Sequence, residues 1–216
     1  MADQIQWHYR AALCEILALG LRYPGDDLVG ALISGEYAQA LDEITAASGL
    51  DESVAALLAR YAGSEDQATL HALRVEHTRL FIGSPQPLIS PYEGVWWALD
   101  DGVQPLLFVN PHTMDVERIY RSFGIGSPEN TNEPLDHVAT ELEFLEYLAS
   151  VEAGLFAPNP GVEVPEKGYG EAYESFMANH VSVWMPRFAD AVVEQSEESF
   201  FVALASVLKA FVCPGE

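Results

Sequence analysis

The chain carries little positive charge. Of its 216 residues only 10 are lysine or arginine, against 33 aspartates and glutamates, which gives a formal net charge of −23. Nucleic acids and anionic membranes are bound through clustered basic side chains, so this composition argues against both partners. A field of this sign favours a cationic partner, such as a basic peptide. An acidic surface that serves only solubility is the alternative.

Cysteine and long apolar runs are also scarce. Cys14 and Cys213 lie outside any CxxC or Cys/His spacing typical of a metal site, so we expect thiols buried in a reduced compartment. No apolar run approaches the roughly 20 residues that cross a bilayer. The opening residues MADQIQWHYR lack the pattern of a secretory signal. We therefore expect a cytoplasmic protein without stable membrane insertion.

Motifs for catalysis and cofactor binding are missing. The sequence has no P-loop, GxGxxG, GxSxG or HExxH motif. A metal site built from Glu133, Asp136, His137 and Glu141 would lack the paired Glu-x-x-His spacing of di-iron bundles. We therefore expect no metal, no cofactor and no catalytic residue. Two alternatives remain: a small helical enzyme with His137 and Asp136 as an acid–base pair, and an assembly subunit with a permanent apolar interface.

Apolar residues, 49% of the chain, recur mostly with helical spacing. This pattern predicts an all-α protein, a single globular domain over 1–216 with about nine to eleven helices. Glycine and proline punctuate the pattern and set the expected boundaries. The expected helices span 3–23, 26–34, 36–47, 51–62, 65–81, 114–123, 132–153, 171–196 and 198–212.

Three interruptions of this helical pattern are informative. Asp101-Gly102 and Asn110-Pro111 read as turns around a short extended segment. Pro186 should kink or divide the helix predicted over 171–196. The Pro/Gly-rich stretch 154–170 reads as a hinge-like linker, which would allow either a monomer or a domain-swapped homodimer.

One stretch that stands out is RLFIGSPQPLISPYEGVWW, residues 79–97. Its prolines, glycines and serines predict an irregular loop, yet it is rich in aromatic and aliphatic side chains. Surface loops are usually polar. This segment is therefore expected to pack on the core or on a ligand.

The stretch TNEPLDHVATELEFLEYLASVEAG, residues 131–154, reads as one long helix. Asn132 is a favourable N-cap, and Glu133 and Pro134 suit the first helical turn. Asp136 and His137 would then lie about 100° apart on the helix surface. The start of this helix would present a proline, a carboxylate and an imidazole together.

Both stretches resemble signatures of the TorD/DmsD family of cytoplasmic chaperones, which are dedicated to the maturation of molybdenum-cofactor oxidoreductases. The first resembles LF-x-G followed by a proline-rich loop and PYES; the second resembles E-P-x-D-H before an amphipathic helix. A C-terminal pattern also resembles the family, so the likeness spans most of the chain. The matching residues are Leu80, Phe81, Gly83, Pro85, Pro87, Leu88, Pro91, Tyr92, Glu93, Trp96, Glu133, Pro134, Asp136, His137, Phe176, His180, Trp184, Pro186 and Phe188.

The sequence departs from the family pattern in and near the first signature. His77 stands where relatives usually carry tyrosine, and Gly83-Ser84-Pro85 replaces Gly-Pro-Gly. Ser90 and Gly94 replace the commoner proline and serine around PYES. These departures bear on the identity of the client protein rather than on membership of the family.

The resemblance implies a TorD-like helical fold and a chaperone that is not an enzyme. Its partners would be the twin-arginine signal peptide and the apo catalytic subunit of an oxidoreductase of the DMSO/TMAO reductase type. Carboxylates would pair with the arginines, and aromatic side chains would take the apolar segment. The implied peptide-binding residues are Phe81, Gly83, Pro91, Tyr92, Glu93, Trp96, Glu133, Pro134, Asp136 and His137.

A structural role for the same residues is the alternative. Glu133 and Asp136 would then only cap the helix, and His137 would only lock the 82–97 loop to it. Guanine-nucleotide binding has been suggested for relatives, but no phosphate loop is present here. The other five histidines show no shared spacing and read as packing or surface residues.

Overall fold

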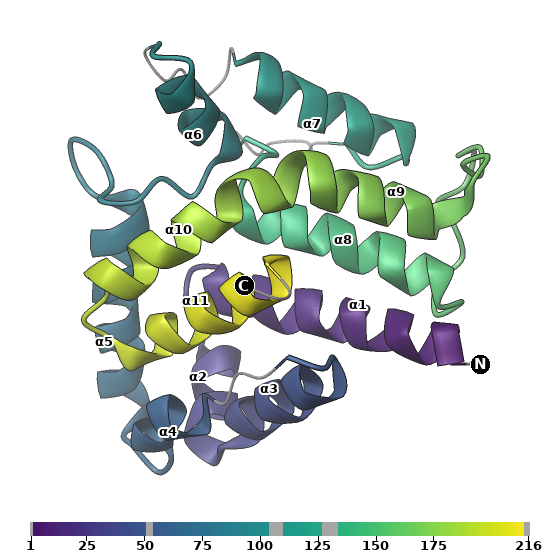
Figure 1. Cartoon of the computed structure of the whole chain (residues 1–216). Coiled ribbons are helices and arrows are strands. Elements are labelled where there is room, and N and C mark those ends of the chain that lie inside the picture. The colour runs from purple at the N-terminus through teal and green to yellow at the C-terminus, as the bar shows by residue number, and fades with distance from the viewer. Residues whose placement is uncertain (1, 51–53, 104–109, 127–133, 214–216) are drawn as a thin grey trace. The chain divides into compact units, whose positions relative to one another are not determined.

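A computed structural model describes residues 2–50, 54–103, 110–126 and 134–213 (Figure 1). Regular secondary structure within these ranges is helical, which confirms the predicted all-α class and the expected number of helices. Short 3₁₀ or π turns lie at Ala59–Tyr61, Thr78–Ile82 and Met177–Val181. The α-helices are α1 (Ala2–Leu21), α2 (Asp26–Ser34), α3 (Glu36–Ala47), α4 (Ala55–Leu58), α5 (Asp66–His77), α6 (Glu93–Asp100), α7 (Pro111–Ser122), α8 (Val138–Glu152), α9 (Gly168–Phe176), α10 (Ser182–Gln195) and α11 (Ser199–Val212).

Most predicted helices are present, but several of their boundaries differ. The irregular segment predicted through residue 97 ends at Tyr92, because α6 begins at Glu93. Asn110-Pro111 is not a free turn: Asn110 is the N-cap of α7, and its side chain accepts a hydrogen bond from the His112 amide. Pro111 occupies the first helical position, where a missing N–H costs nothing.

The start of the helix predicted over 132–153 is also wrong. α8 begins at Val138, and His137 is its N-cap with an extended ψ of 139°. Asp136 therefore precedes the helix, and the expected 100° relation between Asp136 and His137 does not apply. The cause is a backbone pairing between His137 and Tyr92, which holds this part of the chain extended. The expected cap Asn132 lies outside the described residues.

Pro186 does not divide the helix, because α10 continues through it. The regular α-helix is interrupted earlier, at the π turn Met177–Val181, and a kink at Pro186 stays a prediction. In the 154–170 stretch, the described chain stays non-helical until α9 begins at Gly168. A hinge role for this stretch stays a prediction.

The chain divides into two compact units, Met1–Glu15 with Pro91–Trp184, and Ile16–Ser90 with Met185–Glu216. They are called unit 1 and unit 2 below. The single domain expected from the sequence stays a prediction.

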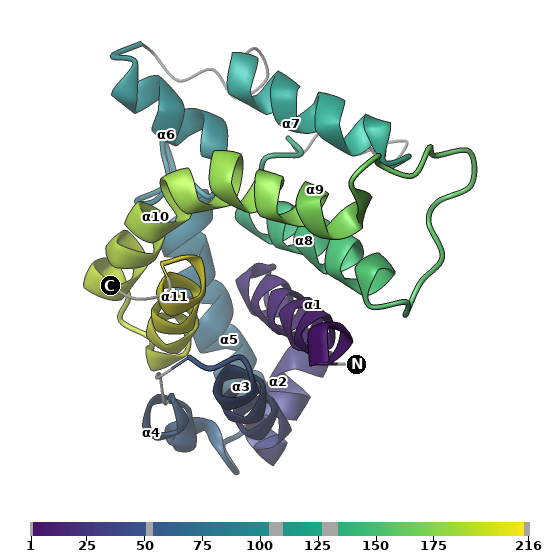
Figure 2. The same ribbon diagram turned by 45° about the vertical axis from the view of Figure 1, so that its right-hand side comes forward.

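Unit 1 is built around an aromatic cluster shared by α7, α8 and α9. Phe144 of α8 lies 4.4 Å from Tyr120 of α7 and 4.8 Å from Phe176 of α9, measured between ring centroids. Figures 1 and 2 both show α8 running beside α9. Cys14 is buried beside the Tyr173 hydroxyl, as expected, whereas Cys213 is only partly buried. This core carries the segments that form the candidate site.

Unit 2 has its own aromatic core around α11. Phe200 and Phe201 are fully buried. The Phe200 ring packs on Tyr37 of α3 at 5.6 Å, and the Phe201 ring lies 5.9 Å from Phe81. Phe81 also stacks on Phe188 at 5.7 Å. The apolar C-terminal helix is therefore a core element of this unit.

Candidate functional site

The two signature segments meet in unit 1. The Glu93 amide donates to the Asp136 carbonyl at 3.0 Å, and the Val138 amide donates to the Pro91 carbonyl at 2.8 Å. Between these two hydrogen bonds, Tyr92 and His137 form an antiparallel bridge. Segments more than 40 residues apart are thus fastened to each other by backbone pairing.

Asp136 reinforces this junction from inside. Its side chain is buried, and Oδ2 accepts hydrogen bonds from the Gly94 amide at 2.8 Å and the Thr113 hydroxyl at 2.7 Å. Burial raises the pKa of Asp136, and these two hydrogen bonds partly offset the effect. The carboxyl group therefore ties the start of α6 to the start of α7.

Gly94 is required by the closeness of these groups. A Cβ atom there would lie 2.5 Å from the Thr113 hydroxyl oxygen and 3.0 Å from Asp136 Oδ2. The Gly94 carbonyl also accepts a hydrogen bond from the Asn110 side chain at 2.6 Å. In this chain the serine common in the family's motif would meet the same atoms.

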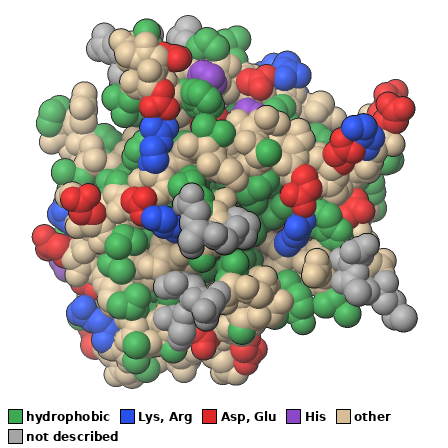
Figure 3. All heavy atoms as spheres, viewed as in Figure 1, with side chains coloured by type: hydrophobic (Ala, Val, Ile, Leu, Met, Phe, Trp, Pro, Cys, Tyr) green, Lys and Arg blue, Asp and Glu red, His purple; other side chains and the backbone are tan. Residues whose placement is uncertain are grey.

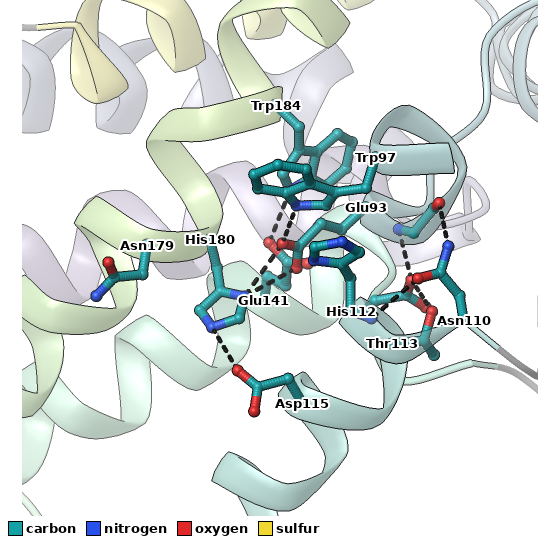
Figure 4. A network of polar contacts seen from close by, with 12 residues as sticks. Glu93, Trp97, Asn110, His112, Thr113, Asp115, Glu141, Asn179, His180 and Trp184 are labelled. Carbon is teal, nitrogen blue, oxygen red and sulfur yellow. Dashed lines mark hydrogen bonds and ion pairs between the residues drawn. The ribbon is translucent and has the colours of Figure 1, made fainter. Parts of the chain in front are cut away.

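Glu93 is fully buried at the first position of α6. Its carboxylate accepts a hydrogen bond from the Trp97 indole at 2.8 Å and lies 3.1 Å from Nδ1 of His180 through both oxygens. The other ring nitrogen of His180 is 3.7 Å from an oxygen of Asp115. Glu93 thus links α6 to the π turn that precedes α10, and His180 continues the link to α7 (Figure 4).

Glu141 is the third buried carboxyl group, in the first turn of α8. Its Oε2 accepts a hydrogen bond from the Trp184 indole at 3.0 Å, while its Oε1 is buried with no hydrogen-bond partner. Burial, then the nearby charge of Glu93, raises the pKa of Glu141 well above its ordinary value. This group is therefore protonated over a wider pH range than a surface glutamate.

His137 has a structural role in this arrangement. Its Nδ1 accepts a hydrogen bond from the Ala139 amide at 3.1 Å, which caps α8. Its ring meets the edge of Tyr92 at a centroid distance of 5.3 Å. This geometry matches the alternative in which His137 locks the 82–97 loop to the helix. Residues 91–94 of that loop, which resemble the PYES motif, are called the PYES-like segment below.

The structure brings only part of the predicted peptide-binding set together. Unit 1 holds Pro91, Tyr92, Glu93, Trp96, Pro134, Asp136 and His137, and unit 2 holds Phe81 and Gly83. Glu133 lies outside the described residues. Glu93 and Asp136 are only 0% and 1% exposed, whereas Tyr92 and Trp96 are half-buried. Direct contact of any of these residues with a peptide stays a prediction.

The contacts around Glu93, Asp136 and Glu141 form one polar network, and the sequence interpretation missed several of its residues. Thr113, Asn110 and Trp97 were assigned no polar role, and His180 was assigned to packing or the surface. Asn110 followed by proline is a typical helix start, and this signal was available. Glu141 shares a helix face with Leu145 and Leu148, so its burial was also predictable. The contact between His180 and Glu93 joins residues 87 apart and has no local signal.

The geometry gives little support to an acid–base pair. His137 Nδ1 is occupied by the Ala139 amide, and Asp136 Oδ2 is occupied by Gly94 and Thr113. Across the described ranges, no group of three or more His, Cys, Asp or Glu side chains is placed to hold a metal ion. Nor is any helix in those ranges both long and apolar enough to cross a membrane.

Comparison with known proteins identifies the class. Residues 45–190 match the family described as nitrate reductase delta subunit, which includes TorD-like proteins. Because the match covers more than half of the chain, the chain belongs to this family. The family resemblance seen in the two signatures is thereby confirmed.

Individual relatives agree with this assignment. The perchlorate reductase assembly chaperone protein of Dechloromonas aromatica is 27% identical over 213 residues, covering 94% of this chain and 86% of the relative. Chaperone protein TorD of Aliivibrio fischeri is 29% identical over 167 residues, covering 76% of this chain and 72% of the relative. A crystal structure described as a redox enzyme maturation protein from Archaeoglobus fulgidus has the same fold, with a TM-score of 0.52, 22% identity, and coverage of 96% and 93%.

Proposed function

We propose that this protein is a dedicated cytoplasmic chaperone for a molybdenum-cofactor oxidoreductase of the DMSO/TMAO reductase type. It binds the twin-arginine signal peptide and the apo form of the catalytic subunit, assists cofactor insertion and delays export. The observation that carries this proposal is the likeness to an assembly chaperone over nearly the full length of both chains.

The charge of the chain supports a cationic ligand. A net charge of −23 speeds the encounter with a peptide that carries paired arginines, and makes binding sensitive to salt. On the face shown in Figure 3, acidic side chains are spread out rather than gathered into one patch. Steering by the whole protein therefore brings the peptide close, and local groups determine where it binds.

Tyr92 and Trp96 are the members of the predicted site with accessible aromatic surface in unit 1. They would contact the apolar part of the peptide or stack on a guanidinium group. Glu93, Glu133 and Asp136 would pair with the arginines, each charge-assisted contact contributing about 1.5–3 kcal/mol. For Glu93 and Asp136, this pairing requires the PYES-like segment to open.

A deletion strain tests the chaperone function. Removing the gene from its host should lower the molybdenum content and the activity of one oxidoreductase while its polypeptide is still made. Complementation with the wild-type gene should restore both. Unchanged metal content and activity of every molybdenum enzyme in the deletion strain would contradict the proposal.

A further inference from the structure

The network of unit 1 buries more negative charge than its basic neighbours offset. Glu93, Asp136 and Glu141 are all at most 1% exposed. Among the described side chains within hydrogen-bond distance of these carboxyl groups, His180 is the one that can carry a positive charge. A buried, unpaired carboxylate is strongly unfavourable, so the cluster is expected to hold a proton or a cation.

Hydrogen-bond donors are divided unequally between Glu93 and Glu141. Both oxygens of Glu93 face His180, and one also accepts from Trp97. Glu141 receives one donor, Trp184, and its Oε1 receives none although it is buried. The side chains of Glu141 and Glu93 are nevertheless within hydrogen-bonding reach of each other. Two carboxylates cannot hydrogen-bond, but a carboxyl group and a carboxylate can.

We propose that Glu93 and Glu141 share one proton, carried by Oε1 of Glu141 and donated to Glu93, and that this hydrogen bond fastens the PYES-like segment to α8. The proton satisfies the buried Glu141 oxygen that otherwise has no partner. It also leaves Glu93 as the anion, which suits its other donors. The contact goes beyond peptide binding, because it makes the closed state of the segment depend on pH.

The surrounding groups reinforce this assignment. Around Glu141 lie Glu93 of α6, Asp136 from the segment before α8, and the buried hydroxyl of Tyr120 from α7. His180 and Asp115 reach the pair only through Glu93. The closest charges acting on Glu141 are therefore negative, and they favour its protonated form.

The sign of the pH dependence follows from this arrangement. In an opened segment Glu141 would regain an ordinary glutamate pKa of about 4.3 and lose its proton at neutral pH. Opening then releases one proton. The equilibrium constant for opening should therefore rise by up to about tenfold per pH unit, between the ordinary glutamate pKa and the raised pKa of Glu141 in the closed state. Higher pH therefore loosens the segment, and lower pH holds it closed.

Two isosteric variants test where the proton lies. In Glu141→Gln the amide keeps an acceptor for Trp184 and presents an N–H to Glu93, so it imitates the protonated group. In Glu93→Gln one of the two oxygens that face Nδ1 of His180 becomes an N–H₂ group, which cannot accept a hydrogen bond from that ring or from Glu141. We expect Glu141→Gln to fold and to be at least as stable as wild type at pH 8, and Glu93→Gln to be less stable. Glu143→Gln, exposed on the same helix, is the matched control.

Hydrogen exchange of the amides of Glu93, Gly94 and Val138 measures opening directly, because all three donate across the junction. After correction for intrinsic exchange, the opening equilibrium constant should rise with pH in the wild type and in Glu143→Gln. It should not rise with pH in Glu141→Gln. Carboxyl ¹³C NMR of the wild type should show one glutamate that stays protonated well above the ordinary range. Equal pH dependence in the wild type and Glu141→Gln, or no such carboxyl signal, would overturn the proposal.

Discussion

At the scale of single residues, the space around Gly94 imposes the tightest constraint in the candidate site. The atoms that a Cβ would meet belong to Thr113, Asp136 and Asn110, and all three side chains are held by hydrogen bonds. None of them can move aside without losing a buried hydrogen bond. The glycine is therefore part of the junction, even though it contributes no side chain.

Gly94→Ala is expected to lower the free energy of unfolding by about 1–3 kcal/mol, the usual cost of overpacking a buried position. Chemical denaturation followed by circular dichroism measures the change. Gly30→Ala is the matched control, because its Cβ meets nothing within 4 Å inside α2. It should be neutral or stabilising by up to about 1 kcal/mol. Equal effects of the two substitutions would contradict the crowding described here.

Glu76 of unit 2 has the opposite electrostatic setting to Glu141. It accepts two hydrogen bonds from Arg79 at 2.7 Å, one from Ser196 at 3.1 Å and one from the Glu197 amide at 2.6 Å. Burial alone would raise its pKa, but these donors outweigh burial and lower it. Glu76 thus fixes the α10–α11 connection as an anion.

Glu76→Gln should therefore destabilise the protein at neutral pH. The stability that Glu76 adds is present above the ordinary glutamate pKa of about 4.3 and is lost as pH falls through its lowered value. The difference in the free energy of unfolding between wild type and variant should become smaller in that acid range. Unfolding midpoints measured from pH 7 to pH 3 check this, and a difference that does not change over the range would refute the assignment.

At the scale of elements, the start of α8 depends on a cap and on a distant strand-like segment. The His137 side chain satisfies the Ala139 amide, and the backbone on both sides of it pairs with residues 91–93. Helix α8 in turn presents Glu141 and Phe144 to the rest of unit 1. Loss of the cap or of the backbone pairing at the N-terminus of α8 should therefore loosen both the aromatic cluster and the polar network.

His137→Ala should cost about 1 kcal/mol in the free energy of unfolding, because it removes the cap and the edge contact with Tyr92. His137→Asn keeps a capping oxygen and should recover most of the capping part. Thermal unfolding of the three proteins compares them directly. The capping role would be wrong if alanine and asparagine at this position gave the same midpoint.

Sequence patterns predicted elements well where the boundary is local. Gly35 adopts a left-handed conformation with φ of 85°, and the helices on both sides have the predicted bounds 26–34 and 36–47. The start of α8 was misplaced because it is set by pairing with residues 91–93, far away in the chain. Favourable capping residues near residue 132 could not reveal that this distant backbone pairing keeps the chain extended up to His137.

The sequence predicted which residues belong to the candidate site better than it predicted what each residue does there. Glu93, Asp136 and His137 were identified from motifs, and the structure brings these three together. Their burial was not foreseen, because it depends on Thr113, His180 and Trp97, which approach only after folding. Which of these residues touch a client peptide remains a prediction.

At the scale of the whole molecule, the dominant property is the net charge of −23. Charge of this size acts on any partner within about a Debye length, roughly 8 Å at physiological salt. It favours basic peptides in general, so it cannot alone select a client. Selection must come from the local arrangement of carboxyl and aromatic groups.

The most direct test of the account is a calorimetric titration with twin-arginine signal peptides of molybdenum oxidoreductases from the same genome, at low and moderate salt. We expect saturable binding to one client peptide, weaker at higher salt and lost when Arg-Arg is replaced by Ala-Ala. A Lys-Lys peptide, with equal charge but no guanidinium groups, should bind more weakly than Arg-Arg. Equal affinity for the Arg-Arg and Ala-Ala peptides, or no binding to any peptide of the set, would contradict the account.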